Sequence, residues 1–157
     1  MKTTRESARE EAHRHVVKSL QELLEKNYDA EKDYKKAIER ADKAQLKEYF
    51  KKQGLMHNHF ATELDREIHV LNEHPVEKSS GLNKLHRTWI NLKNSITGRK
   101  DENLLKECLE GERNCIKEYE EKLKKNHFPG HIEDVLRSQL KEMKAACSQL
   151  HSLTDVE

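Results

Sequence analysis

The sequence contains few of the residues that interrupt helices. Only two prolines and five glycines occur among 157 residues, and most of them lie between segments whose apolar residues recur at helical spacing. Long apolar runs are absent, because none approaches the roughly 18 residues that a membrane-spanning helix needs. The first 15 residues also lack the apolar stretch of a secretory signal. These absences predict a cytoplasmic protein that has no membrane partner.

Cysteine is scarce, and neither sign of charge is in large excess. Cys108 and Cys115 lie seven positions apart on one predicted helix, about 10 Å at 1.5 Å per residue, which is too far for a disulfide. With Cys147 the number is odd and no C-x-x-C pattern occurs, so the three are predicted to be reduced core residues. Thirty basic and twenty-nine acidic residues are interspersed, which argues against nucleic acid as a partner.

Apolar residues at spacings of three and four extend over most of the sequence and predict helices. A capping box of Thr3 with Glu6, or of Ser7 with Glu10, opens a first helix that ends near Ala41. The stretch before residue 16 is too polar to pack well. It is predicted to be an extension, helical or frayed, outside the folded domain.

Capping residues and chain breaks divide the rest of the sequence. Asp42 is predicted to cap a second helix that ends before Pro75, and Asp101 to cap a further long helix. A break at residues 128–130 separates that helix from the last one, which extends to about Leu153. The sequence therefore predicts four long helices.

A shorter amphipathic helix is predicted between the second and third long helices. Its apolar residues extend from Leu82 to Ile96, and it ends at Gly98. Trp89 on its apolar face is predicted to anchor it to the other helices. This order of elements predicts an all-α, up-and-down four-helix bundle with one extra short helix, in a single domain over residues 16–153.

Each long helix carries a polar residue within its apolar stripe, where a bundle usually has leucine. These residues are Glu31, Glu63, Glu112 and Gln139. Carboxylates that converge from different helices are how ferritin-like bundles hold two metal ions. The four residues are therefore candidate ligands for iron, manganese or zinc, with His59, one turn before Glu63, as a weaker candidate.

The alternative is that these carboxylates lie at the edges of the stripes and are satisfied by polar neighbours. The Glu-x-x-His pairs of a di-iron site are missing, since Glu63 is followed three positions later by Arg66 and Glu112 by Cys115. The polar neighbours that could satisfy the carboxylates are Tyr34, Tyr119, Arg66, Arg113 and water. Most of the ten histidines, including His57, are predicted to be exposed because lysine and glutamate surround them.

No phosphate-binding loop, dinucleotide fingerprint or nucleophile elbow occurs in the sequence. The residues therefore identify no catalytic group, and an enzyme is not favoured.

The order and spacing of four segments resemble those of a bacterial family of small ferritin-like proteins, the domain of unknown function 2383. The segments are LLEKNYDAEKDYKKA, FATELDREI, GLNKLHRTWINLK and CLEGERNCIKEYEEKL. The resemblance covers residues 16–153. It implies a ferritin-like bundle of unestablished activity, in which Glu31, Tyr34, Glu63, Glu112 and Tyr119 match the family's polar core positions. Members tend to have a histidine in the last helix where this sequence has Cys147.

Three hypotheses about function follow. The first is a non-catalytic helical bundle, stress-related or acting through an unknown protein partner. The alternatives are a di-metal carboxylate protein with oxidase or peroxide-handling activity, and a homo-oligomeric assembly module. Convergence of Glu31, Glu63 and Glu112 in the folded core would favour the metal protein.

Overall fold

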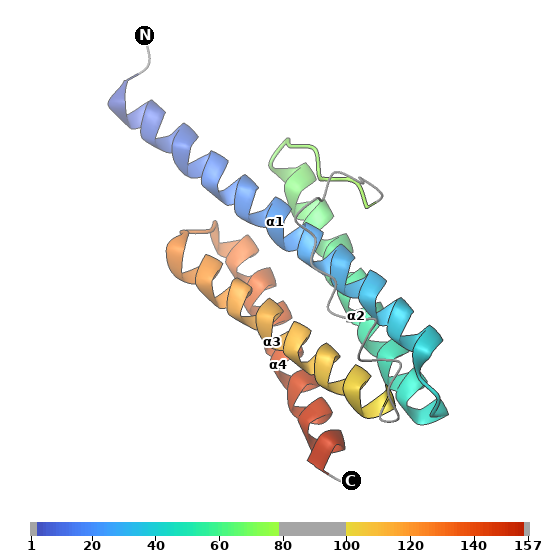
Figure 1. Cartoon of the computed structure of the whole chain (residues 1–157). Coiled ribbons are helices and arrows are strands. Elements are labelled where there is room, and N and C mark those ends of the chain that lie inside the picture. The colour runs from blue at the N-terminus through green and yellow to red at the C-terminus, as the bar shows by residue number, and fades with distance from the viewer. Residues whose placement is uncertain (1–2, 79–99, 156–157) are drawn as a thin grey trace.

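The computed structural model describes residues 3–78 and 100–155, which form four helices and no strand. The helices are α1 (Thr4–Arg40), α2 (Ala44–Val70), α3 (Lys100–Lys125) and α4 (Gly130–Asp155) (Figure 1). The predicted short helix and Trp89 lie outside the described residues. No helix within the described ranges is long and apolar enough to cross a membrane.

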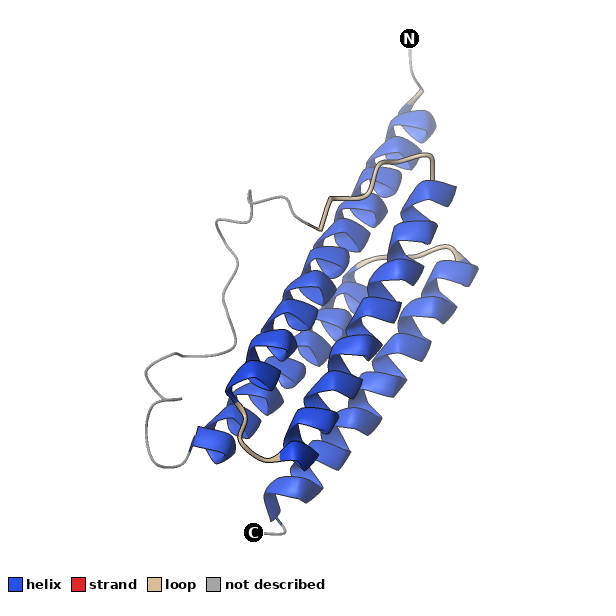
Figure 2. Cartoon of the chain, turned by 90° about the vertical axis from the view of Figure 1, so that its right-hand side faces the viewer, coloured by secondary structure: helices blue, strands red, loops and turns tan. Residues whose placement is uncertain are grey.

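The helices form two hairpins that pack side by side. α1 lies along α2 and α3 along α4, while α1 also contacts α3 and α2 contacts α4 (Figure 2). Ser19 in the first half of α1 contacts Asn126 just after α3, and Asp42 just after α1 contacts Lys100 at the start of α3. α1 and α3 are therefore antiparallel, so α2 and α3 run in the same direction. The predicted four-helix bundle is confirmed, with antiparallel helices inside each hairpin and with α2 parallel to α3.

Some of the predicted capping residues are found at the helix ends and others are not. The capping box is confirmed, because Thr3 Oγ1 accepts a hydrogen bond from the Glu6 N–H at 3.2 Å and the Glu6 carboxylate accepts one from the Thr3 N–H at 3.1 Å. The predicted cap at Asp42 is wrong, since Lys43 precedes α2 and gives it no side-chain cap. Asp101 lies in the first turn of α3 and accepts hydrogen bonds from the backbone N–H groups of Asp42 and Lys43, at 2.8 and 3.0 Å. This carboxylate satisfies N–H groups that the start of α2 leaves without helical partners.

The apolar core consists of two clusters. One surrounds Leu20, Leu64 and Leu136, and the other surrounds Phe50 and Leu104. Full burial of each such side chain stabilises the fold by about 1.5–3 kcal/mol. Between the two clusters every helix contributes polar side chains, which are described below.

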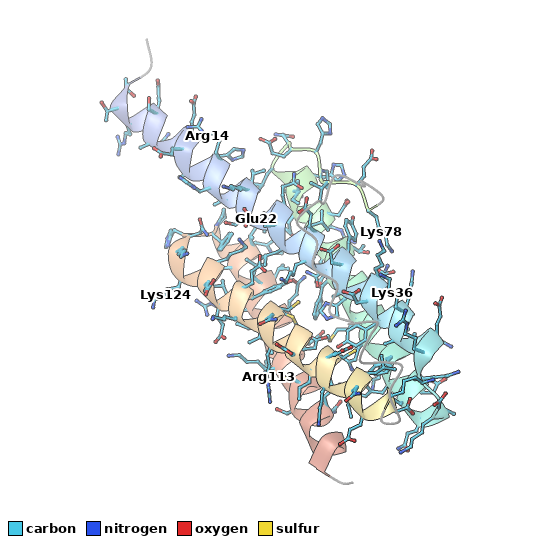
Figure 3. The ribbon with its side chains drawn as sticks, in the orientation of Figure 1. Arg14, Glu22, Lys36, Lys78, Arg113 and Lys124 are labelled. Carbon is cyan, nitrogen blue, oxygen red and sulfur yellow. The ribbon has the colours of Figure 1, made fainter. Side chains whose placement is uncertain are left out.

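The outer surface is strongly charged. Charged side chains project from all four helices (Figure 3). The first three turns of α1 are exposed from Thr3 to His15 and extend past the other helices (Figure 1). Within this stretch, His13 Nε2 contacts Glu73 Oε1 at 3.1 Å.

Candidate functional site

Glu112 is fully buried at the centre of the bundle. It lies on the inner face of α3, one turn from Cys108 and from Cys115, which are also buried. Its Oε1 atom accepts a hydrogen bond from the Tyr34 hydroxyl of α1 at 2.6 Å and lies 2.6 Å from His57 Nε2 of α2. Glu112 and Tyr34 are thus interior polar residues, in contact with each other.

His57 corrects the sequence-based prediction, because it has no exposed surface instead of facing solvent. Its ring lies 5.8 Å from the Tyr34 ring and 5.9 Å from the Phe60 ring. The signal was its spacing: His57 follows buried Gln53 by four positions and precedes Phe60 by three, so it continues the inner stripe of α2. The polar neighbours Asn58 and His59 concealed that signal.

Asn27 fixes the proton on His57. Its Nδ2 group donates to the Leu23 carbonyl and to the Tyr119 hydroxyl, both at 2.8 Å. A carbonyl oxygen can only accept, so the amide orientation is determined and Asn27 Oδ1 faces His57 Nδ1 at 2.8 Å. His57 Nδ1 therefore carries a proton and donates it.

The contact between His57 and Glu112 must also hold a proton. Two unprotonated acceptors would repel each other at the 2.6 Å between Nε2 and Oε1. The pair therefore shares one proton in this contact and has no net charge, whichever atom carries that proton. A neutral, hydrogen-bonded pair avoids the large cost of an uncompensated charge in the interior.

The hydrogen bonds continue to α4. The Tyr119 hydroxyl donates to Gln139 Oε1 at 2.7 Å, and Gln139 Nε2 donates to the Phe60 carbonyl at 3.3 Å and to Glu63 Oε1 at 3.2 Å. Donors thus point in one direction from His57 to Glu63, and the chain joins all four helices. The buried polar layer is defined here as Asn27, Tyr34, His57, Glu112, Tyr119 and Gln139.

Burial keeps the hydroxyl and thiol groups of this region neutral. It raises the pKa of Tyr34 well above the usual range, and the nearby Glu112 raises it further. The pKa of Tyr119 is also raised by burial, although the hydrogen bond from Asn27 opposes the shift. Cys108 and Cys115 have thiol pKa values raised by burial and by Glu112, so they are poor nucleophiles and metal ligands.

Glu31 is directed to a different set of partners. Its carboxylate accepts hydrogen bonds from Lys78 at 2.7 Å and Asn58 at 3.1 Å, and it pairs with Lys35 at 3.2 Å. Burial would raise the pKa of Glu31, but these donors lower it below its usual value. Lys78, which follows α2, thus supplies a partner that the helical stripes alone did not indicate.

Glu63 and His59 lie towards solvent. The Glu63 side chain is 33% exposed and that of His59 is 70% exposed, with 3.7 Å between His59 Nε2 and Glu63 Oε1. In the described part of the chain, no group of three or more histidine, cysteine, aspartate or glutamate side chains could hold a metal ion. Glu31, Glu63 and Glu112 thus contact different sets of protein groups.

No curated protein matches this sequence. Among solved structures, the chain is similar to a mutant of Dps1 from Mycobacterium smegmatis, with 16% identity and a TM-score of 0.78. The similarity covers 92% of this chain and 97% of that one, and it shows the ferritin-like fold alone. The model of one family, described as Domain of unknown function (DUF2383), matches residues 15–125. Because this span is well over half of the chain, the protein belongs to the DUF2383 family.

Proposed function

We propose that this protein is a non-catalytic helical bundle that acts by contact with protein partners, and that its buried polar layer is structural. The observation that carries the proposal is that Glu31, Glu63 and Glu112 each contact protein groups, while Glu112 Oε2 is buried without a hydrogen-bond partner. Glu112 binds His57 and Tyr34, Glu31 binds Lys78 and two other donors, and Glu63 accepts from Gln139. A metal ion bound through the contacted oxygens would have to displace these contacts.

The polar layer has a physical role without a cofactor. Most of its bonds join groups on different helices, so a slip of one helix along its neighbour would leave several buried groups unpaired. An unpaired buried group costs about 1–3 kcal/mol. The layer therefore favours one register of the four helices over others that an apolar core would tolerate.

The exposed start of α1 supports the proposal that the protein acts by contact with protein partners. The exposed start of α1 gives a partner about three turns of helix that the bundle leaves uncovered. A second copy of the chain is one possible partner. A mass measured by light scattering that rises with protein concentration is expected if copies associate, and a constant monomer mass would exclude this form of the proposal.

Metal content tests the structural role of the carboxylates. Protein purified without chelators is expected to contain no stoichiometric iron, manganese or zinc by plasma mass spectrometry. The double variant Glu31→Ala/Glu112→Ala should give the same result, as should a control with Glu48→Ala and Glu142→Ala, which are exposed. Near-stoichiometric metal that is lost only in the Glu31/Glu112 variant would overturn the proposal in favour of the di-metal hypothesis.

A further inference from the structure

A groove of about 910 Å³ lies between the first half of α1 and the second half of α3. Its volume is in the range of sites that hold small organic molecules. Six side chains that carry or can carry positive charge line it: His15, Lys18, Lys117, Lys122, Lys125 and His127. It is called the α1–α3 groove below.

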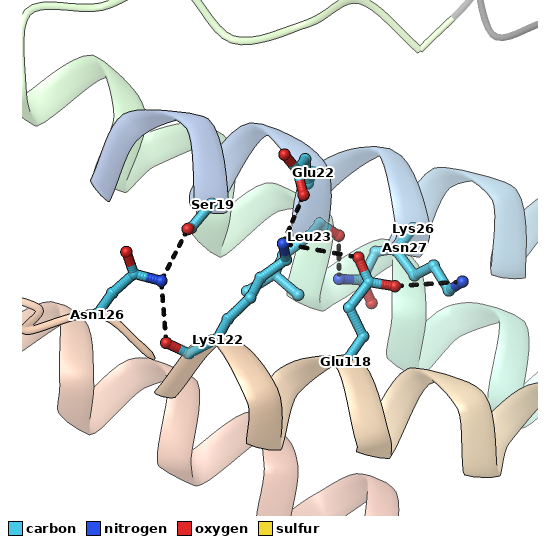
Figure 4. Close-up of polar contacts among 8 residues, drawn as sticks. All are labelled: Ser19, Glu22, Leu23, Lys26, Asn27, Glu118, Lys122 and Asn126. Atoms are coloured by element: carbon cyan, nitrogen blue, oxygen red, sulfur yellow. Dashed lines mark hydrogen bonds and ion pairs between the residues drawn. The ribbon is translucent and has the colours of Figure 1, made fainter. Parts of the chain in front are cut away.

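Lys122 lies at the floor of the groove, where its side chain is only 15% exposed. Its Nζ atom lies 2.5 Å from Glu22 Oε2 and 3.8 Å from Glu118 Oε1, while Glu118 Oε2 lies 3.2 Å from Lys26 Nζ (Figure 4). These two acids and two lysines neutralise one another. They also hold Lys122 in place, so that little side-chain entropy remains to be lost on binding.

The other charged residues of the α1–α3 groove do not balance. The lining as a whole has four lysines and three glutamates, a surplus of one positive charge with both histidines neutral. Lys26, which pairs with Glu118 but is not part of the lining, brings the surplus to two. A concave surface with excess charge of one sign concentrates ions of the other sign.

Neutral donors lie beside these charges. Asn126 Nδ2 donates to Ser19 Oγ and to the Lys122 carbonyl, each at 3.0 Å (Figure 4). Because Ser19 Oγ accepts that bond, its hydroxyl proton can be donated to another acceptor. The lining of the groove contains lysine and no arginine among the described residues. Lysines bind phosphate oxygens as separate point charges, without the fixed fork geometry of arginine.

We propose that the α1–α3 groove binds a small molecule that carries phosphate groups. Lys122 and Ser19 contact it at the floor, and Lys18 and Lys125 contact it at the rim. The acids Glu22 and Glu118 keep their lysine partners and position Lys122.

Isothermal titration calorimetry with inorganic pyrophosphate at low salt tests this site. Saturable binding is expected to the wild-type protein, and about tenfold weaker binding to Lys18→Gln/Lys125→Gln, because two charged contacts are lost. The control Lys47→Gln/Lys141→Gln removes the same charge at exposed positions outside the groove and should bind as the wild type does. The proposal would be overturned if the wild-type protein showed no saturable binding of pyrophosphate. It would also be overturned if the two double variants lost the same amount of affinity.

Further titrations define the chemistry of the ligand. Adenosine diphosphate is expected to bind at least as tightly as pyrophosphate, because the volume of the groove exceeds that of two phosphates. Citrate, a tricarboxylate, is expected to bind at least tenfold more weakly. Citrate binding as tight as that of pyrophosphate would refute the preference for phosphate. Lys122→Gln should weaken pyrophosphate binding without changing the helix content measured by circular dichroism.

Discussion

The buried polar layer and the α1–α3 groove both join α1 to α3 through carboxylates, but they differ in access to water. Glu112 has no exposed surface, whereas the side chains of Glu22 and Lys122 are 42% and 15% exposed. A buried group that loses its partner cannot be solvated, so its removal costs several kcal/mol, while exposed pairs are worth about 0–1 kcal/mol. The same residue types therefore stabilise the bundle in one place and are available for binding in the other.

The largest effect is expected from Glu112→Ala. The change removes the contacts that Glu112 makes with the Tyr34 hydroxyl and His57 Nε2 and creates a cavity, so the free energy of unfolding should fall by about 3–5 kcal/mol. Urea denaturation followed by circular dichroism measures this change. The control Glu110→Ala alters an exposed residue of the same helix and should stay within about 0.5 kcal/mol of the wild type. A loss of similar size in both variants would contradict the comparison.

A smaller loss of stability is expected from Tyr119→Phe. The ring still packs, but Gln139 Oε1 loses its donor and Asn27 Nδ2 loses one acceptor. Stability should fall by about 1–3 kcal/mol in the same urea assay. Tyr28→Phe, at a partly buried tyrosine outside the layer, is the matched control. Equal stability of Tyr119→Phe and the wild type would show that the layer does not depend on this hydroxyl.

Lys122→Gln should change stability by less than about 1 kcal/mol, because its partners are open to water. The difference in stability between Lys122→Gln and the wild type should become smaller as the salt concentration rises, because exposed charges are screened. Thermal unfolding at low and high ionic strength measures both the stability difference and its dependence on salt. A loss as large as that of Glu112→Ala would mean that the groove is part of the folding core.

The smallest change in stability is expected from Glu31→Gln, and it depends on pH only in the acidic range. Because the donors around it lower its pKa below the usual 4.5, its contribution is present above that value and is lost as pH falls through the pKa of the folded state. The stability advantage of wild type over Glu31→Gln should therefore decrease between about pH 5 and pH 3. Glu48→Gln, at an exposed site, should show no such trend. An advantage that grows in acid would contradict the sign of the shift.

Much of the fold could be predicted from local patterns. The Thr3–Glu6 capping box and the break at residues 128–130 mark helix ends through chemistry that acts over a few residues. Glu112 and Tyr119 were recognisable as interior residues because each lies on a stripe of three- and four-residue spacing. Such signals need no knowledge of the other helices.

The partners of the polar residues could not be predicted in this way. His57 was misassigned because its neighbours are polar, although its position on α2 is interior. Glu31 pairs with Lys78, and Asp101 with the backbone at residues 42–43, across 47 and 58–59 positions of sequence. These contacts depend on how the two hairpins meet, and no local pattern records that arrangement.

The protonation of His57 tests most directly the claim that the interior is a hydrogen-bonded layer and not a metal centre. In nitrogen-15 magnetic resonance spectra, with the signal assigned by its loss in His57→Gln, we expect a slowly exchanging proton on Nδ1. This signal should not change when iron, manganese or zinc is added. An Nδ1 without a proton, or a signal that shifts at one equivalent of metal, would contradict the account.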